Sequence, residues 1–96
     1  MKTKIEEIKY SQLTPFERKQ VREEFIRLQK NKCFYCKKSL LNEPPLKITN
    51  MKIDWDNFPD NFLKYPIHLQ HNHLTDEVEG AVHSYCNAVM WQYEGR

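Results

Sequence analysis

Three cysteines and one histidine constrain the fold of this chain most strongly. They form two short pairs that are far apart in the sequence, Cys33-x-x-Cys36 and His83-x-x-Cys86. Two half-sites of this spacing, brought together by folding, are typical of a structural Cys3His zinc site. A zinc staple also suits a chain of 96 residues of which 29% are charged, because its hydrophobic core must be thin. We therefore expect a single small domain, residues 1–96, built around a closed zinc site.

The first pair admits two other interpretations when it is taken alone. A redox C-x-x-C motif would follow a strand and open a helix, whereas here an amphipathic segment precedes Cys33 and no βαβ pattern follows Cys36. A pair of buried thiols is the other alternative. The second half-site favours zinc because it uses every cysteine of the chain, although His68 remains a weaker candidate for the fourth ligand. An odd number of cysteines also favours metal binding over disulfides in a reducing compartment.

An amphipathic helix is predicted over residues 14–31. Thr14 is a good N-cap, Pro15 suits the first helical position, and Glu17 completes a capping box. Apolar side chains then recur at helical spacing on one face, namely Val21, Phe25 and Leu28. Loosely helical spacing within residues 1–13 also admits a short helix there. The cysteine pair at residues 33–36 would follow the main helix as a zinc knuckle.

The remainder of the chain is predicted to contain a strand, a turn, a second strand and a helix. Residues 65–73 alternate as in a strand, 75–77 form a turn, 78–82 return as a strand, and 84–93 are helical with Ser84 as N-cap and Val89, Met90 and Tyr93 inward. Upstream, residues 46–53 alternate as in another strand, and 54–61 indicate a loop in which Asp54 and Asp56 are solvated. Aromatic side chains there should form a satellite core or stack on bases: Trp55, Phe58, Phe62 and Tyr65.

The overall charge is nearly balanced, with 15 basic and 13 acidic side chains. Contact with nucleic acid would therefore need a local cluster, for which lysines around the first cysteine pair and the last residue are candidates: Lys30, Lys32, Lys37, Lys38 and Arg96. The N-terminus has no apolar secretion signal, and no stretch approaches the ~20 apolar residues that span a bilayer. These features predict a soluble cytoplasmic protein without membrane contact.

Three further residues are left for another role once zinc has taken His83. His71 and His73 are two apart on an extended segment, so they should project to the same face. Asn87 directly follows a zinc ligand at the start of the last predicted helix. If zinc pins this helix against the strand pair, Asn87 should face the segment that carries His71.

The run Q-H-N-H-L-T-D-E-V-E-G-A-V-H-S-Y-C-N resembles the core of the HNH, or ββα-metal (His-Me finger), endonucleases. It is most similar to the phage recombination endonuclease VII branch, which carries D-H-x-H-x-x-x-G-x-V-R-G-L-x-C-x-x-C-N after an upstream C-x-x-C. The resemblance implies an α+β fold, a small zinc-stapled ββα-metal domain with its core at residues 66–94 and an additional N-terminal helix. By position it implies that His71 is the general base, that His73 supports it near the phosphate, and that Asn87 binds a catalytic Mg²⁺ or Mn²⁺.

Two positions depart from that family pattern. His83 stands where the family usually has cysteine, and imidazole is an equally good zinc ligand. Gln70 stands where relatives have an aspartate that binds the catalytic ion, and an amide oxygen is a weaker magnesium ligand than a carboxylate. Three outcomes follow for Gln70: a site completed by Asn87, water and substrate phosphate, a site with another ligand such as His73 or a carboxylate, or an enzyme of reduced activity.

The resemblance implies a metal-dependent DNA endonuclease or nickase, an enzyme that hydrolyses phosphodiester bonds in double-stranded DNA with low sequence specificity. A bacterial or phage-infected host cytoplasm is the implied setting. The chain lacks the C-terminal extension with which relatives dimerise, so a monomer is expected. The alternative from another class is a non-catalytic zinc-binding module that binds nucleic acid or protein. A zinc hydrolase that uses the histidines themselves is disfavoured because the cysteines already make a closed site.

Overall fold

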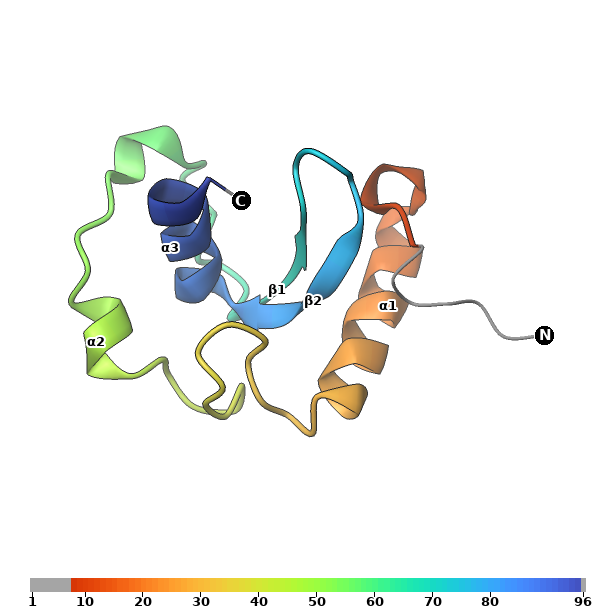
Figure 1. Cartoon of the computed structure of the whole chain (residues 1–96), viewed down its shortest axis with the longest axis horizontal. Helices are drawn as coiled ribbons and strands as arrows, with labels where there is room; N and C mark the ends of the chain where they lie inside the picture. The colour runs from red at the N-terminus through yellow and green to blue at the C-terminus, as the bar shows by residue number, and fades with distance from the viewer. Residues whose placement is uncertain (1–7, 96) are drawn as a thin grey trace.

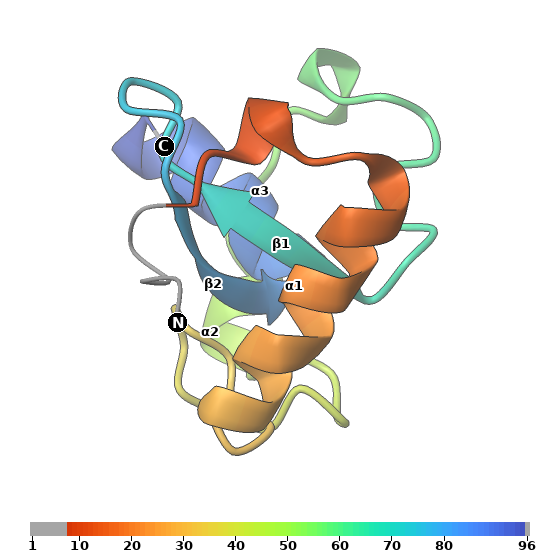
Figure 2. The same ribbon diagram turned by 90° about the vertical axis from the view of Figure 1, so that its right-hand side faces the viewer.

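In the computed structural model, which describes residues 8–95, two helices pack against a two-stranded antiparallel sheet. The strands β1 (Ile67–His71) and β2 (Val78–His83) form a hairpin, and α1 (Pro15–Leu28) and α3 (Ser84–Glu94) are the helices. The hairpin lies between α1 and α3 (Figure 1), and the view from the side places α1 over the strands with α3 behind them (Figure 2). The expected small α+β fold is confirmed at this level, with the strand pair and the helix of the predicted core in place.

The predicted N-terminal helix is present but ends earlier than expected. Its capping box is formed, because the Glu17 amide donates to Thr14 Oγ1 (3.1 Å) and the Thr14 amide donates to Glu17 Oε1 (2.9 Å). The helix ends at Leu28 rather than near residue 31, because Lys30 and Asn31 have positive φ angles of 56° and 64°. This left-handed turn reverses the chain and leads it into the first cysteine pair.

The predicted strand over residues 46–53 is wrong. Pro45 is the N-cap of a four-residue helix, α2 (Leu46–Thr49), which buries Ile48 and leaves Leu46 75% exposed. Short alternating runs fit either structure, and no third strand pairs with the sheet among the described residues. A 3-10 helix, η3 (Trp55–Asn57), follows, with the Asp54 side chain accepting the Asp56 amide as in the solvated turn expected there.

Side chains of β2 and α3 form the centre of the core, with Ala81, Val82, Val89 and Met90 fully buried. Two details of α3 differ from the prediction. His83 rather than Ser84 occupies the N-cap, and Tyr93 is 51% exposed, with its hydroxyl donating to the Lys52 carbonyl oxygen instead of packing inward.

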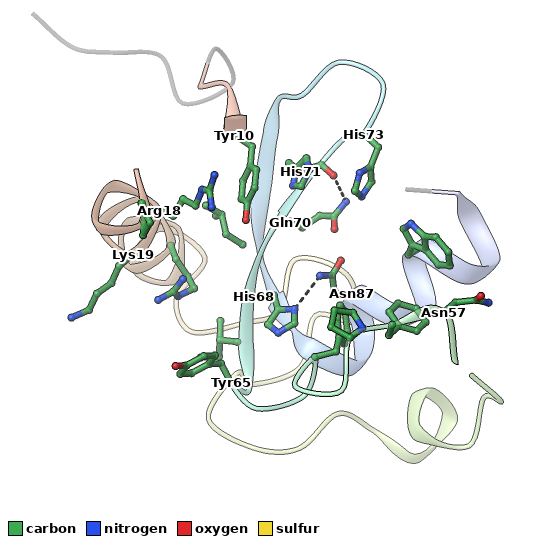
Figure 3. Close-up of a pocket in the computed structure, with 18 residues that line it drawn as sticks. Tyr10, Arg18, Lys19, Asn57, Tyr65, His68, Gln70, His71, His73 and Asn87 are labelled. Atoms are coloured by element: carbon green, nitrogen blue, oxygen red, sulfur yellow. Dashed lines mark hydrogen bonds between the residues drawn. The ribbon is translucent and has the colours of Figure 1, made fainter. Parts of the chain in front are cut away.

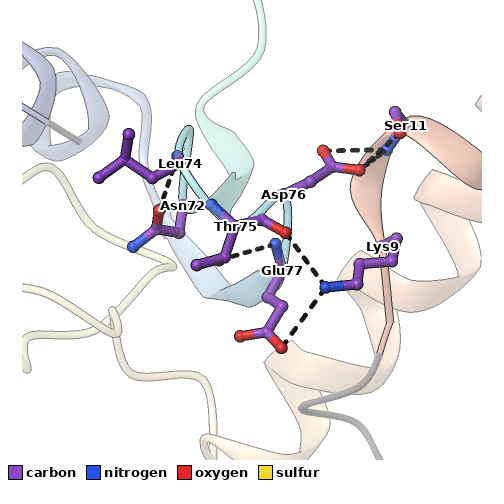
Figure 4. Close-up of polar contacts among 7 residues, drawn as sticks. All are labelled: Lys9, Ser11, Asn72, Leu74, Thr75, Asp76 and Glu77. Carbon is purple, nitrogen blue, oxygen red and sulfur yellow. Dashed lines mark hydrogen bonds and ion pairs between the residues drawn. The ribbon is translucent and has the colours of Figure 1, made fainter.

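Hydrogen bonds and an ion pair join the N-terminal segment to the hairpin turn (Figure 4). This segment contains a second 3-10 helix, η2 (Tyr10–Gln12). The Tyr10 amide donates to the Asp76 carbonyl oxygen (2.8 Å), and Ser11 donates to the Asp76 carboxylate, which lowers the pKa of that carboxyl group. Lys9 adds an ion pair to Glu77 (3.6 Å). These contacts hold the Tyr10 side chain beside β1. Residues 1–7, part of the possible helix over residues 1–13, lie outside the described residues.

Within the described part of the chain, none of the helices combines the length and the apolar character that crossing a bilayer requires. The longest, α1, has 14 residues and carries charged side chains along its polar face.

Candidate functional site

The two predicted half-sites meet in one cluster at the junction of β2 and α3. One ligand atom from each of Cys33, Cys36, His83 and Cys86 lies within 4.8 Å of all the others. Nδ1 of His83 is 3.5 Å from Sγ of Cys36 and 3.6 Å from Sγ of Cys86. Three of the four residues are buried, so the cluster is closed to solvent on most sides. This Cys3His set could hold a zinc ion in the arrangement of a structural site.

The first cysteine pair forms a tight knuckle whose backbone amides donate hydrogen bonds to a sulfur atom. The amides of Tyr35 and Cys36 donate to Sγ of Cys33 (3.3 and 3.4 Å). A hydrogen bond from the Cys86 thiol is the main cause that lowers the pKa of Cys33 to about 4, and the same bond together with burial raises the pKa of Cys86. One thiolate is thus stabilised by neighbours alone. A bound cation would be needed to keep three thiolates together in so small a volume.

The ring of His83 is held in the tautomer that a metal ligand needs. Its Nε2 atom lies 2.9 Å from the Ser39 carbonyl oxygen and 3.0 Å from the Asn42 carbonyl oxygen. Both partners only accept hydrogen bonds, so Nε2 carries the proton and donates it. The lone pair of Nδ1 therefore points at the sulfur atoms, the relationship seen for histidine ligands oriented by an outer carbonyl group.

His68, the weaker candidate for the fourth zinc ligand, is not part of this cluster. It lies instead in a pocket of about 870 Å³ on the other side of the N-terminus of α3. The same pocket is lined by all the residues that the family resemblance selected for catalysis (Figure 3): Gln70, His71, His73 and Asn87. The structure thus separates the metal-binding side chains into a buried cluster and an open pocket.

A β-bulge interrupts the pairing of β1 with β2 beside this pocket. Gln70 pairs with Gly80, but His71 pairs with Val78, so Glu79 has no partner on β1. The extra residue of the bulge is thus on β2, and a bulge bends the strand that carries the extra residue. All five residues of β1, Gln70 and His71 included, line the pocket.

The imidazole of His71 is enclosed by two other rings. It stacks on Tyr10, with ring centroids 3.9 Å apart and planes at 9°, and its centroid is 4.5 Å from that of His73. Arg18 covers the Tyr10 ring at 4.4 Å. Burial first, then the positive charges of His73 and Arg18, lower the pKa of His71. The neutral imidazole, which can accept a proton, is therefore favoured.

The amide groups of Gln70 and Asn87 are both oriented by hydrogen bonds. Nδ2 of Asn87 donates to Nδ1 of His68 (3.0 Å), not to His71. Nε2 of Gln70 donates to the His71 carbonyl oxygen (2.8 Å) and is 3.4 Å from a carboxylate oxygen of Glu79. Since both NH₂ groups are engaged, the two amide oxygens remain available to a ligand in the pocket. His68 thus orients Asn87. The sequence signal for His68 is its position two residues before Gln70, which puts both side chains on the same face of the strand.

Positive charge in the pocket comes from α1 and not from the lysines around the knuckle. Arg18, Lys19 and Arg22 line the pocket, and no aspartate or glutamate is among the described residues that do so. The predicted DNA contacts Lys30, Lys32, Lys37 and Lys38 are not among its lining residues, and Arg96 lies outside the described residues. No local pattern distinguishes these α1 cations from those of a solvated helix face. Their meeting with the hairpin depends on how the helix crosses the sheet.

Comparison with family models, with curated proteins and with solved structures found no match to this chain. The assignment of a function therefore rests on the residues of the two sites and on their geometry.

Proposed function

We propose that this protein is a metal-dependent DNA endonuclease or nickase of the HNH, or ββα-metal, type. The observation that carries the proposal is the pocket in which a neutral histidine, His71, lies beside two oriented amide oxygens, those of Gln70 and Asn87, opposite a cationic helix face. The zinc cluster next to Asn87 would fix the helix that presents it. A phosphodiester is an anion, and a pocket with three cations and no lining carboxylate suits one.

The chain's own groups would perform three parts of the hydrolysis. Arg18, Lys19 and Arg22 attract and hold the phosphodiester. His71 accepts a proton from a water molecule that attacks phosphorus, and the imidazole carries that proton away from the reacting atoms. Tyr10 and His73 restrict the rotation of the His71 ring and exclude water from its faces. Gln70 and Asn87 would present their amide oxygen atoms beside His71.

The donor set in the pocket fits a divalent cation in kind, because magnesium prefers oxygen ligands and amide carbonyl groups provide them. It provides no negative charge, since no carboxylate lines the pocket among the described residues. The ion would therefore be held jointly by Gln70, Asn87, water and the substrate phosphate. When bound, such an ion neutralises charge on the leaving 3′ oxygen.

The absence of a lining carboxylate also favours a second candidate function, a zinc-stapled module that binds nucleic acid without cleaving it. In that case Gln70 marks a site that has lost its ion, and the cations of α1 serve binding alone. The two functions differ in one observable, the breaking of a phosphodiester bond.

Nicking of supercoiled plasmid DNA tests the proposal. Zinc-loaded protein is expected to convert plasmid to the open circular form when Mg²⁺ or Mn²⁺ is added, and to leave it intact when the added ion is omitted. Omission is a better control than a strong chelator because a chelator would also remove structural zinc. Absence of nicking with either ion, from protein of full zinc content that still binds DNA, would establish the non-catalytic alternative.

Gln70→Asp is expected to raise the affinity for Mn²⁺ in the absence of DNA by at least about tenfold. A tenfold change in affinity corresponds to ~1.4 kcal/mol. This is only a small part of the Coulomb attraction that a carboxylate adds close to a divalent ion. Electron paramagnetic resonance of free Mn²⁺ measures the affinity directly. Gln70→Asn is the matched control, because asparagine has the side-chain length of aspartate without its charge. Equal affinities of the two variants would show that position 70 does not face the ion.

A further inference from the structure

Aromatic side chains form the wall of the pocket opposite α1. Phe58, Phe62 and Trp91 form it, with the Phe58 centroid 4.7 Å from that of Phe62 and 5.1 Å from that of Trp91. Phe62 continues this wall to His68, with centroids 4.8 Å apart. Trp91 is 42% exposed, so the wall presents ring surface to solvent. Tyr65, which is 64% exposed, lines the pocket on the α1 side of β1 (Figure 3). A contiguous exposed aromatic surface in a small protein indicates a binding site.

The opposite wall carries the cations. Arg18 and Lys19 project from α1 on one side of β1, whereas Asn57 lies on the other side, with His68, Gln70 and Asn87 between them (Figure 3). Nε of Arg18 is buried and has no hydrogen-bond partner among residues 8–95. A buried guanidinium nitrogen without an acceptor favours an anionic ligand that supplies one. One side of the pocket therefore suits phosphate and the other suits the face of a ring.

A nucleic acid strand with unpaired bases is the ligand that combines these two properties. Proteins that bind single strands use a cationic groove along the backbone and aromatic side chains on which bases stack. In a duplex the base faces are covered by neighbouring bases, so the aromatic wall would have no partner. The pocket volume of about 870 Å³ falls in the range of sites that enclose small molecules, which extends to about 1,000 Å³.

We propose that the pocket binds a DNA strand in unpaired form, with its phosphates along Arg18, Lys19 and Arg22, and with bases against Phe58 and Trp91 on one side and against Tyr65 on the other. This inference rests on the proposed function and makes it more specific, because it names locally single-stranded DNA as the substrate. The scissile phosphate would lie between the two walls, beside His71. Supercoiled plasmid contains such regions through transient melting, whereas relaxed duplex contains few.

Fluorescence anisotropy with labelled oligothymidylate and with a labelled duplex tests the inference in buffer without magnesium. Zinc-loaded protein is expected to bind the single strand at least about tenfold more tightly than the duplex. Trp91→Ala should weaken single-strand binding about tenfold, the effect of losing one stacked base. Tyr65→Ala, at a more exposed position, should act in the same direction and serves where Trp91→Ala fails to fold. Phe16→Ala is the matched control, since Phe16 is 67% exposed and does not line the pocket.

The salt dependence tests the cationic wall separately. Arg22→Gln should reduce the slope of log affinity against log salt by about 0.7, the value for one phosphate contact on a single strand. Lys38→Gln removes one charge outside the pocket and should leave that slope unchanged. Tighter binding of duplex than of single strand, or unchanged single-strand affinity in both well-folded aromatic variants, would overturn the inference. Binding is measured without cleavage, so a protein that nicks DNA but prefers duplex refutes this inference and leaves the proposed endonuclease standing.

Discussion

Replacement of Cys33 by serine is expected to release zinc and to unfold the protein. Structural zinc sites contribute about 10–16 kcal/mol of apparent binding energy, whereas a whole domain is stable by only about 5–15 kcal/mol. Cys33 is 1% exposed, and its sulfur atom accepts two backbone amides in addition to facing the other ligands. A hydroxyl group at this position is a poor zinc ligand and would leave three ligands around the ion. The loss should therefore be comparable with the total stability of the domain.

Zinc content by atomic spectroscopy and the thermal unfolding transition by circular dichroism measure this result. Every cysteine belongs to the cluster, so the matched pair is best made with histidines. His83→Ala should behave like Cys33→Ser, whereas His73→Ala, at an exposed pocket position, should retain both zinc and its unfolding transition. His83→Cys should still bind zinc through four thiolates. A Cys33→Ser protein with normal zinc content and melting temperature would refute a structural zinc site.

The Cys3His cluster connects the fold with the pocket through two consecutive residues. Cys86 is fully buried in the cluster, and Asn87 is the next residue of α3. Adjacent helical residues point about 100° apart. The side chain of Cys86 can therefore lie in the cluster while that of Asn87 lies in the pocket. Loss of zinc should therefore remove Asn87 from the pocket as well as unfold the core.

Local signals in the sequence predicted the parts of the structure that depend on a few neighbouring residues. The capping box at Thr14 and the spacing of the four Cys3His residues are examples, because caps and metal half-sites have fixed local geometry. The hairpin at residues 67–83 also follows from local alternation. Its bulge, in which Glu79 is the extra residue of β2, arises from the pairing of β1 with β2 and leaves no local pattern.

Features that depend on tertiary contacts were not predictable in this way. The carbonyl groups of Ser39 and Asn42 that orient His83 are in an irregular segment without a motif. The cationic wall depends on the face with which α1 packs against the hairpin, and the polar side of an amphipathic helix is normally solvated. The strand predicted over residues 46–53 is wrong, since Leu46–Thr49 form one helical turn. A short alternating run has too few residues to distinguish the two structures.

Substitution of His71 by alanine is expected to abolish plasmid nicking while zinc content and folding stay intact. Removal of a general base typically reduces a rate by about 10²–10⁴-fold, which places residual activity near the detection limit of a nicking assay. His71 is half-buried and stacks on Tyr10, but it belongs neither to the zinc cluster nor to the buried core. DNA binding should be retained as well, because the cations of α1 are untouched.

His73→Ala is the matched control for this experiment. It removes the same kind of side chain two residues further along the chain, and the His73 ring centroid is 4.5 Å from that of His71. Its effect should be smaller, since His73 supports the His71 ring and, in this proposal, does not itself take the proton. Rates from single-turnover nicking with a fixed excess of protein would compare the two variants directly. Nicking by clean His71→Ala protein at the wild-type rate would exclude His71 as the base, and a larger loss in His73→Ala than in His71→Ala would transfer that role to His73.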